Sequence, residues 1–239
     1  MAIDREIAAL YPELAKQGSL ANLLQATLRG IGSSLSVTDY PAAYYAQVKA
    51  GQRSSQVFVA AKSREFLFDF WKRGVKIADA KTPDIALVAR AIDHWNVSLC
   101  NAEELASAFR FVKVQPNAAV YERGEEVEHA WEEYLQSIGQ DFPNLVAFVT
   151  AAAAEPKLRQ LFPFMSHDTF RFSRCTGYPF TSDTPWVVPR GQDQYEVIGP
   201  GGESLGGGNA ARAVALAVAG LPANCGAAVA GTAEDFLGG

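Results

Sequence analysis

Apolar residues recur along this chain with two different spacings, which predict helices in some segments and strands in others. After Ser19, a residue type that often caps helix starts, apolar residues from Leu20 to Ile31 follow the i, i+3, i+4 spacing of an amphipathic helix. From residue 34 to 80, short apolar runs are separated by glycine and lysine, as in antiparallel strands. Within them Phe66 to Phe70 alternates, so its phenylalanines are expected in the core and Asp69 on a solvated face.

A second helical region and a second strand region follow along the chain. A helix is expected from Asp84 to about Trp95, and residues 101–162 are expected to be helical throughout, with breaks at glycine and proline. From His167 onward, alternation and a glycine-rich turn at 199–202 predict strands again. A last helix is expected from Asn209 to about Leu221.

These elements predict an α+β protein with antiparallel sheets and segregated helices. The expected parts are N-terminal helices, a first sheet with a helix, a helical segment, and a second sheet with a C-terminal helix, over residues 1–33, 34–98, 99–165 and 166–239. Both sheet regions end in a hairpin followed by a helix, so two related strand-strand-helix lobes bridged by the helical segment are one interpretation. A chance recurrence of a common local arrangement is the other. Whether the strands form one sheet or two, and one compact unit or several, is left open.

Composition and charge exclude several classes of protein. The hydrophobic fraction of 49% is enough for a core without disulfides or metals, and the net charge of -5 argues against binding to nucleic acid. The longest apolar run, residues 147–154, is far shorter than the roughly 20 residues of a membrane-spanning helix. The first residues lack the pattern of a signal peptide, and three widely spaced cysteines fit reduced thiols. The chain is therefore expected to be cytoplasmic, with no membrane partner.

Cofactor and metal signals are weak. Gly206 to Ala211 formally fits the dinucleotide pattern G-x-G-x-x-A, but it follows a hairpin strand instead of a parallel one. An anionic group at the start of that last helix remains an alternative. His94, His129 and His167 are far apart in sequence, and no Cys-x-x-Cys motif occurs. We therefore expect no cofactor and no metal.

The strand expected around residues 167–175 is the best candidate for a functional site. Read with a period of two, one of its faces carries the residues His167, Thr169, Arg171, Ser173 and Cys175. A histidine can transfer protons near neutral pH, arginines can hold an anionic group in a bidentate manner, and a thiol near positive charge can act as a nucleophile. An outward sheet face with ordinary polar residues is the competing interpretation, and an inert packing cysteine competes with the nucleophile.

The turn after this strand completes the candidate site. Within the candidate site, His167 is the expected catalytic acid or base, and Tyr178 and Asp183 are expected to assist as catalytic residues. Arg171 and Arg174 are expected to orient an anionic group, and Trp186 to form part of the rim, as substrate-binding residues. Any ligand should lie against the polar side of this strand, near residues 176–179 and under Trp186.

Nearly the whole chain also carries a family resemblance. The segments concerned are residues 10–18, 88–95, 109–123, 162–179, 194–205 and 226–235. In these segments the chain resembles an uncharacterised actinobacterial family labelled as natural product biosynthesis proteins. The resemblance implies a setting in bacterial secondary metabolism, but it carries no cofactor or catalytic residue.

Two functions remain compatible with the sequence. The first is a cofactor-independent tailoring enzyme, of cyclase, lyase or isomerase type, that acts on a natural-product intermediate through acid–base chemistry without redox steps. The second is a non-catalytic binding protein for a peptide precursor, a carrier-bound intermediate or a product of the same pathway. Both imply a small molecule or a peptide as partner; the oligomeric state is left open.

Overall fold

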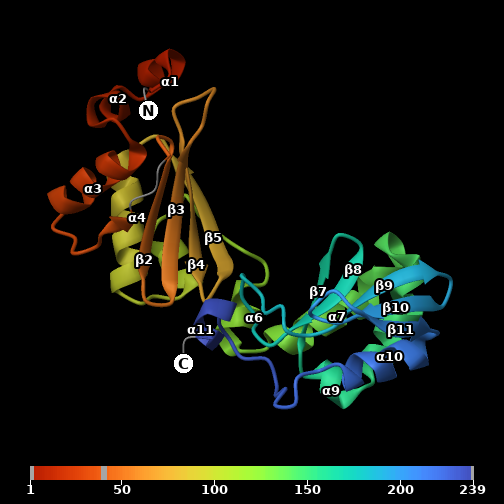
Figure 1. Ribbon diagram of the computed structural model, residues 1–239. Coiled ribbons are helices and arrows are strands. Elements are labelled where there is room, and N and C mark those ends of the chain that lie inside the picture. The colour runs from red at the N-terminus through yellow and green to blue at the C-terminus, as the bar shows by residue number, and fades with distance from the viewer. Residues whose placement is uncertain (1–2, 39–41, 238–239) are drawn as a thin grey trace. The chain divides into compact units, whose positions relative to one another are not determined.

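The computed structural model describes residues 3–38 and 42–237. It divides the chain into two compact units, Met1–Glu122 and Arg123–Gly239, each with its own sheet and its own hydrophobic core (Figure 1). Helices and antiparallel sheets together confirm the predicted α+β class. In the described part of the chain, no helix is both long and apolar enough to span a membrane.

The sheet of the first unit has six strands in chain order, each antiparallel to the next. They are β1 (Val37–Thr38), β2 (Tyr45–Ala50), β3 (Arg53–Val59), β4 (Phe66–Lys72), β5 (Val75–Thr82) and β6 (Val112–Val114). Alternation in β4 buries Phe66, Phe68 and Phe70, as the sequence predicts.

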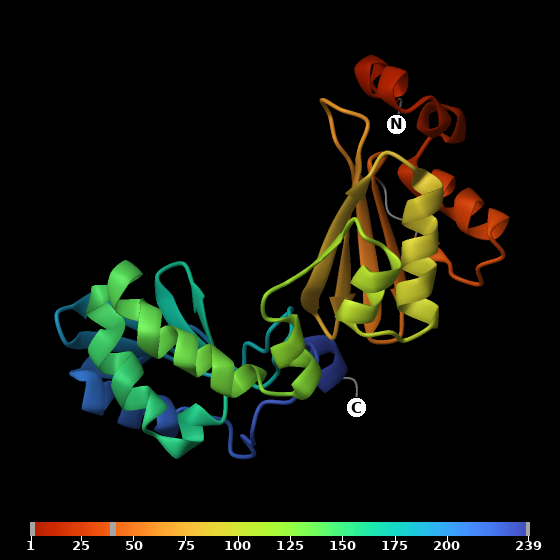
Figure 2. The same cartoon turned by 180° about the vertical axis from the view of Figure 1, so that it is seen from behind.

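In its described residues the first unit has six helices, which are α1 (Arg5–Leu10), α2 (Pro12–Gln17), α3 (Leu20–Gly30), α4 (Ile85–Val97), α5 (Ala102–Ala108) and α6 (Ala118–Arg123). Two of them, α3 and α4, form the other side of its core. Figures 1 and 2 show α3 and α4 against one face of this sheet. Asp84 caps the start of α4, and its carboxylate accepts a hydrogen bond of 2.8 Å from the amide of Ala86.

An arginine on β3 holds the end of α4. The Nη1 of Arg53 donates a hydrogen bond of 2.6 Å to the carbonyl of Trp95, and its guanidinium carbon lies 4.1 Å from the centre of the Trp95 ring. Only 7% of Arg53 is exposed. This side chain therefore caps a helix C-terminus and packs on its last tryptophan at once.

The opposite face of the first sheet carries Asp69, which is less solvated than the sequence predicts. Asp69 is part-buried, lies across from Asp79 on β5, and accepts a hydrogen bond of 3.2 Å from the amide of Gln56. Burial, the largest cause, raises the pKa of Asp69 above its ordinary value.

We expect Asp69→Asn to make the protein more stable at pH 7. A carboxyl whose pKa is raised by folding stabilises the protein fully below the unfolded pKa of about 3.9, and this contribution is lost as pH rises through the folded pKa. The gain from asparagine should therefore disappear below about pH 4, which urea unfolding at both pH values can measure. Asp93→Asn on α4 controls for the loss of one charge. An equal gain at both pH values would show that ionisation of Asp69 is not the cause.

The sheet of the second unit has five strands, also a meander, in the order β11-β10-β9-β8-β7 with antiparallel neighbours. They are β7 (Phe162–Ser166), β8 (Thr169–Ser173), β9 (Trp186–Gly191), β10 (Gln194–Ile198) and β11 (Ser204–Gly208). The glycine-rich turn at 199–202 joins β10 to β11 as predicted.

Helices cover one face of the second sheet. The helices of this unit are α7 (Glu126–Asp141), the 3₁₀ helix η1 (Pro143–Leu145), α8 (Val146–Ala153), α9 (Pro156–Arg159), α10 (Ala210–Ala219) and α11 (Ala233–Leu237), of which α11 lies away from the sheet (Figure 1). Figure 2 shows α7 and α8 over this sheet, and α10 packs on β10 and β11. The core between them is aromatic, with Phe170 and Phe172 of β8 against Trp131 and Phe148. The other sheet face is left for the residues described below.

The segment predicted as helical throughout, residues 101–162, contains strand β6 and leads directly into strand β7. Moreover, the boundary between the units falls near residue 122, so the helices expected to bridge two lobes belong to one unit or the other. A short apolar run such as Val112–Val114 is compatible with a helix or a strand. In the structure this run is a strand because it pairs with β5. Both units contain a hairpin followed by a helix, β4–β5–α4 and β10–β11–α10. A common origin of the two stays a prediction.

Candidate functional site

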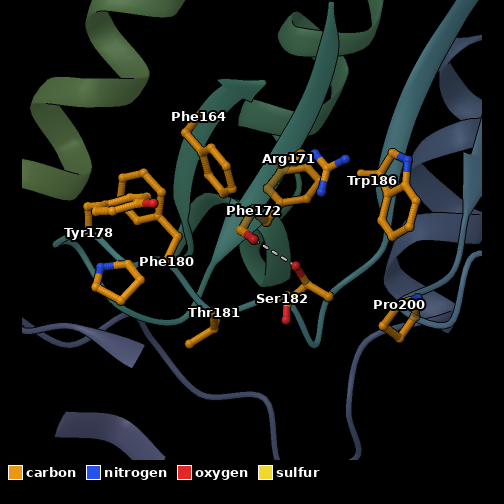
Figure 3. Close-up of a pocket in the computed structure, with 11 residues that line it drawn as sticks. Phe164, Arg171, Phe172, Tyr178, Phe180, Thr181, Ser182, Trp186 and Pro200 are labelled. Carbon is orange, nitrogen blue, oxygen red and sulfur yellow. Dashed lines mark hydrogen bonds between the residues drawn. The ribbon is translucent and has the colours of Figure 1, made fainter. Parts of the chain in front are cut away.

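A hollow of about 430 Å³ lies on the second sheet's face away from the helices, under the loop that joins β8 to β9 (Figure 3). Its lining is mainly aromatic and hydroxyl-bearing: Phe164, Arg171, Phe172, Tyr178, Pro179, Phe180, Thr181, Ser182, Thr184, Trp186 and Pro200. This size, and an apolar lining with few polar groups, are typical of small-molecule sites.

Three side chains form a row across the strands beneath the hollow. Alternation in β8 turns Phe170 and Phe172 toward the helices and Arg171 to the opposite face. The pairing register places Arg171 between Phe164 of β7 and Trp186 of β9. Sequence therefore fixes this row through β-strand periodicity and strand pairing.

The guanidinium of Arg171 has a defined position but no counter-charge. Its carbon lies 4.6 Å from the centre of the Trp186 ring, and its Nε donates a hydrogen bond of 3.0 Å to the hydroxyl of Thr169. Among the described residues no carboxylate forms an ion pair with Arg171, and its two terminal nitrogens have no hydrogen-bond partner. The side chain is part-buried, so this charge is only partly hydrated.

Hydroxyl groups fix the loop that covers the hollow. Thr184 donates a hydrogen bond of 2.7 Å to the carbonyl of Phe172, drawn as the dashed line in Figure 3. The hydroxyl of Thr181 accepts one of 2.9 Å from the amide of Arg174. Phe180 packs on Phe164, with ring centres 4.4 Å apart. These bonds tie residues 181–184 of the loop to β8 and to Arg174 directly after it, and the aromatic rings of the loop line the hollow.

A later segment of the chain is joined to the same loop. Val229 forms a parallel bridge with Cys175, and the amide of Gly177 donates a hydrogen bond of 2.7 Å to the carbonyl of Gly231. The amide of Ala233 donates another of 2.7 Å to the carbonyl of Pro179. Residues 228–233 thus support the loop through backbone contacts on both sides of Tyr178.

Arg174 and Asp183, predicted to bind substrate and to assist catalysis, pair with each other. Arg174 Nη1 lies 2.7 Å from an Asp183 carboxylate oxygen, and its guanidinium carbon lies 4.3 Å from the centre of the Phe236 ring. Neither residue lines the hollow. The ion pair neutralises both charges and links two residues of the loop. Its role is therefore to hold the loop.

His167 is not on the strand face where the sequence analysis placed it. The chain turns at His167 and Asp168, which both have positive φ, 49° and 59°, and β8 begins only at Thr169. These two residues form a two-residue hairpin turn between β7 and β8. The sequence predicts helices up to residue 162 and no strand β7, so it does not predict this turn. His167 is exposed, with its ring Nδ1 3.1 Å from the hydroxyl of Ser166, and it does not line the hollow.

Cys175 is fully buried, against the expectation of an open polar face ending there. Its Sγ lies 3.6 Å and 3.7 Å from the carbonyl oxygens of Gly177 and Pro179, under the loop. The neighbouring Ser173 is buried as well. These contacts fit the packing cysteine, not the nucleophile.

The other chemical motifs have local partners. At the start of α10, the carboxylate of Asp193 accepts a hydrogen bond of 2.9 Å from the backbone amide of Ala210. The side chain of Asn209 accepts one of 3.1 Å from the backbone amide of Arg212. Side chains of the protein therefore already occupy this helix N-terminus. The described residues contain no group of three His, Cys, Asp or Glu side chains that could hold a metal ion.

Of the six predicted site residues, the hollow brings together Arg171, Tyr178 and Trp186. Phe164 and Phe180 were missed, although the alternating Phe162-Pro163-Phe164 and the run Tyr178-Pro179-Phe180 signal them. The hydroxyls of Thr181, Ser182 and Thr184, and Pro200 in the β10–β11 turn, carry no sequence signal of their own.

Comparison with known proteins concerns mainly the second unit. No curated protein matches the chain, and no solved structure does. One family model covers the strands of this unit, its helices from α7 to α10 and the whole lining of the hollow. Residues 125–232 match DUF6193, a family of unknown function.

Proposed function

We propose that the second unit is a non-catalytic binding module, and that its ligand lies in the hollow against Arg171 and Trp186. The observation that carries this proposal is the unpaired guanidinium of Arg171. Four other arginines of the unit, Arg123, Arg159, Arg174 and Arg190, each have a carboxylate partner, and the remaining one, Arg212, is exposed to solvent. The terminal nitrogens of Arg171 are not among the buried side-chain atoms that lack a partner, so water reaches them, and an anionic ligand in the hollow would replace that water with charge-assisted hydrogen bonds.

The composition of the lining favours binding over acid–base catalysis. The lining contains no histidine, carboxylate, lysine or cysteine, and Tyr178 is its one residue from the predicted catalytic set. A general acid or base must lie within hydrogen-bond reach of the proton it transfers. Because His167 and Asp183 lie outside the lining, the tailoring enzyme has less support than the binding protein.

The proposal includes the biological setting. On the family resemblance of the sequence, we propose that this binding module acts in the cytoplasm of a bacterium, in natural product biosynthesis. Its ligand would then be an intermediate, a peptide precursor or a product of such a pathway.

A fragment screen by NMR tests the binding module. We expect fragments that bind the ¹⁵N-labelled full chain to shift the amide signals of Arg171 and Trp186 and of the non-proline residues in 178–182, because these line the hollow. Over a day of incubation, the fragment signals should show no new species. Binding should weaken at least about tenfold in Trp186→Ala, which removes one aromatic wall.

The matched control is Val188→Ala, two residues further along β9 and outside the lining. It should leave fragment binding unchanged. Shifts scattered over both units, or equal weakening in both variants, would contradict a site in this hollow. Conversion of a bound fragment would instead support the enzyme.

A further inference from the structure

Building on the proposed function, we propose that the ligand is a small, flat aromatic acid with a free carboxylate. The carboxylate would meet Arg171, and the aromatic part would lie among the rings of the hollow. The inference rests on which surfaces of Arg171 are still available, on the chemistry of the opposite wall, and on which hydroxyls are already used.

Arg171 has one edge left for a ligand. One face of its guanidinium packs on Trp186, and its Nε is used by Thr169. The edge with the two terminal nitrogens has no partner among the described residues, and Figure 3 shows this group beside Trp186 at one side of the hollow. Two parallel N–H donors match the two oxygens of a carboxylate. Because Trp186 and Thr169 hold the group, little side-chain freedom is lost on binding.

The opposite side of the hollow consists of aromatic rings. Phe164 and Phe180 lie 4.4 Å apart between ring centres at an interplanar angle of 31°, and Tyr178 stands edge-on to Phe180 at 89°. Tyr178 is 69% exposed, which is high for an aromatic ring beside a cavity. A flat ring can stack on such surfaces and cover them from water.

The remaining polar groups disfavour other ligand classes. The hydroxyls of Thr181 and Thr184 already bond to the backbone of Arg174 and Phe172, so only those of Tyr178 and Ser182 remain in the lining for a sugar. Arg171 is the single charged residue of the lining, which suits one negative charge better than a phosphate dianion. An acyl group bound to a carrier would have lost its carboxylate. The free acid therefore fits this hollow better than the carrier-bound form.

The experiment compares three matched ligands on the full chain by calorimetric titration. They are 2-naphthoate, the neutral 2-naphthamide, and decahydro-2-naphthoate, which keeps the charge but not the flat ring. We expect 2-naphthoate to bind at least about tenfold more tightly than either of the others. Arg171→Gln should remove the difference between naphthoate and naphthamide. Arg190→Gln, a change at an arginine paired with Glu196 and outside the lining, should preserve it.

The outcomes separate this inference from the proposed function. If naphthoate and naphthamide bind equally and both shift the hollow's amides, the acid is overturned and the binding module stands. If no fragment or naphthyl compound binds there, both fail. The tripeptide Gly-Gly-Phe with a free carboxylate distinguishes the source of the acid. If it binds tenfold more tightly than naphthoate, the ligand is the end of a peptide, and the small acid is overturned.

Discussion

Phe170→Ala is expected to lower the free energy of unfolding of the second unit by about 3–5 kcal/mol, the usual cost of deleting a buried aromatic ring. Phe170 is fully buried, and its ring contacts those of Trp131, Tyr134, Phe148 and Phe172. The helices and the sheet meet at this ring, so the cavity cannot collapse without moving both. Hydrogen exchange of amides in β8 and β9 under urea measures the effect.

The first unit has a separate core, so its amides should keep their protection in this variant. Leu135→Ala on α7 is the control, because Leu135 is 43% exposed and should cost less than about 1 kcal/mol. A loss below 1 kcal/mol for Phe170→Ala would contradict the central position of this ring. An equal loss of protection in the first unit would show that the units do not unfold separately.

Arg53→Ala is expected to destabilise the first unit by about 2–4 kcal/mol. The substitution leaves the carbonyl of Trp95 without its donor at the end of α4, and it removes the cation from the Trp95 ring. Arg53→Lys should recover only part of the loss, since an ammonium lacks the planar group that packs on the indole. Urea unfolding followed by far-ultraviolet circular dichroism measures both variants.

Arg90→Ala is the matched control, because Arg90 lies on the same helix with an exposed side chain. Its effect should stay within about 0.5 kcal/mol. If the two alanine variants unfold alike, the guanidinium of Arg53 does not hold the helix.

Local patterns predict most elements of this fold, because their signals lie within a few residues. The cap at Ser19, the alternation of Phe66, Phe68 and Phe70, and the turn at 199–202 all lead to the expected structure. Strands β6 and β7 were missed because their short apolar runs become strands only through pairing with distant segments.

The same distinction explains the outcome for the candidate site. Arg171 and Trp186 lie together because the register of β8 and β9 pairs them, and both were singled out from sequence. His167 was assigned to the wrong face because the hairpin turn depends on β7. The pairing of Arg174 with Asp183 requires the fold of a loop, which no periodicity reports.

The bridge between Val229 and Cys175 has a consequence for synthesis of the chain on the ribosome. Strands β7 to β9 emerge early enough to pair while translation continues, and the row of Phe164, Arg171 and Trp186 can form with them. The loop over that row is also joined to residues 228–233, which are made later. The hollow of a nascent chain is therefore complete only after residues 228–233 have been made and have joined the loop.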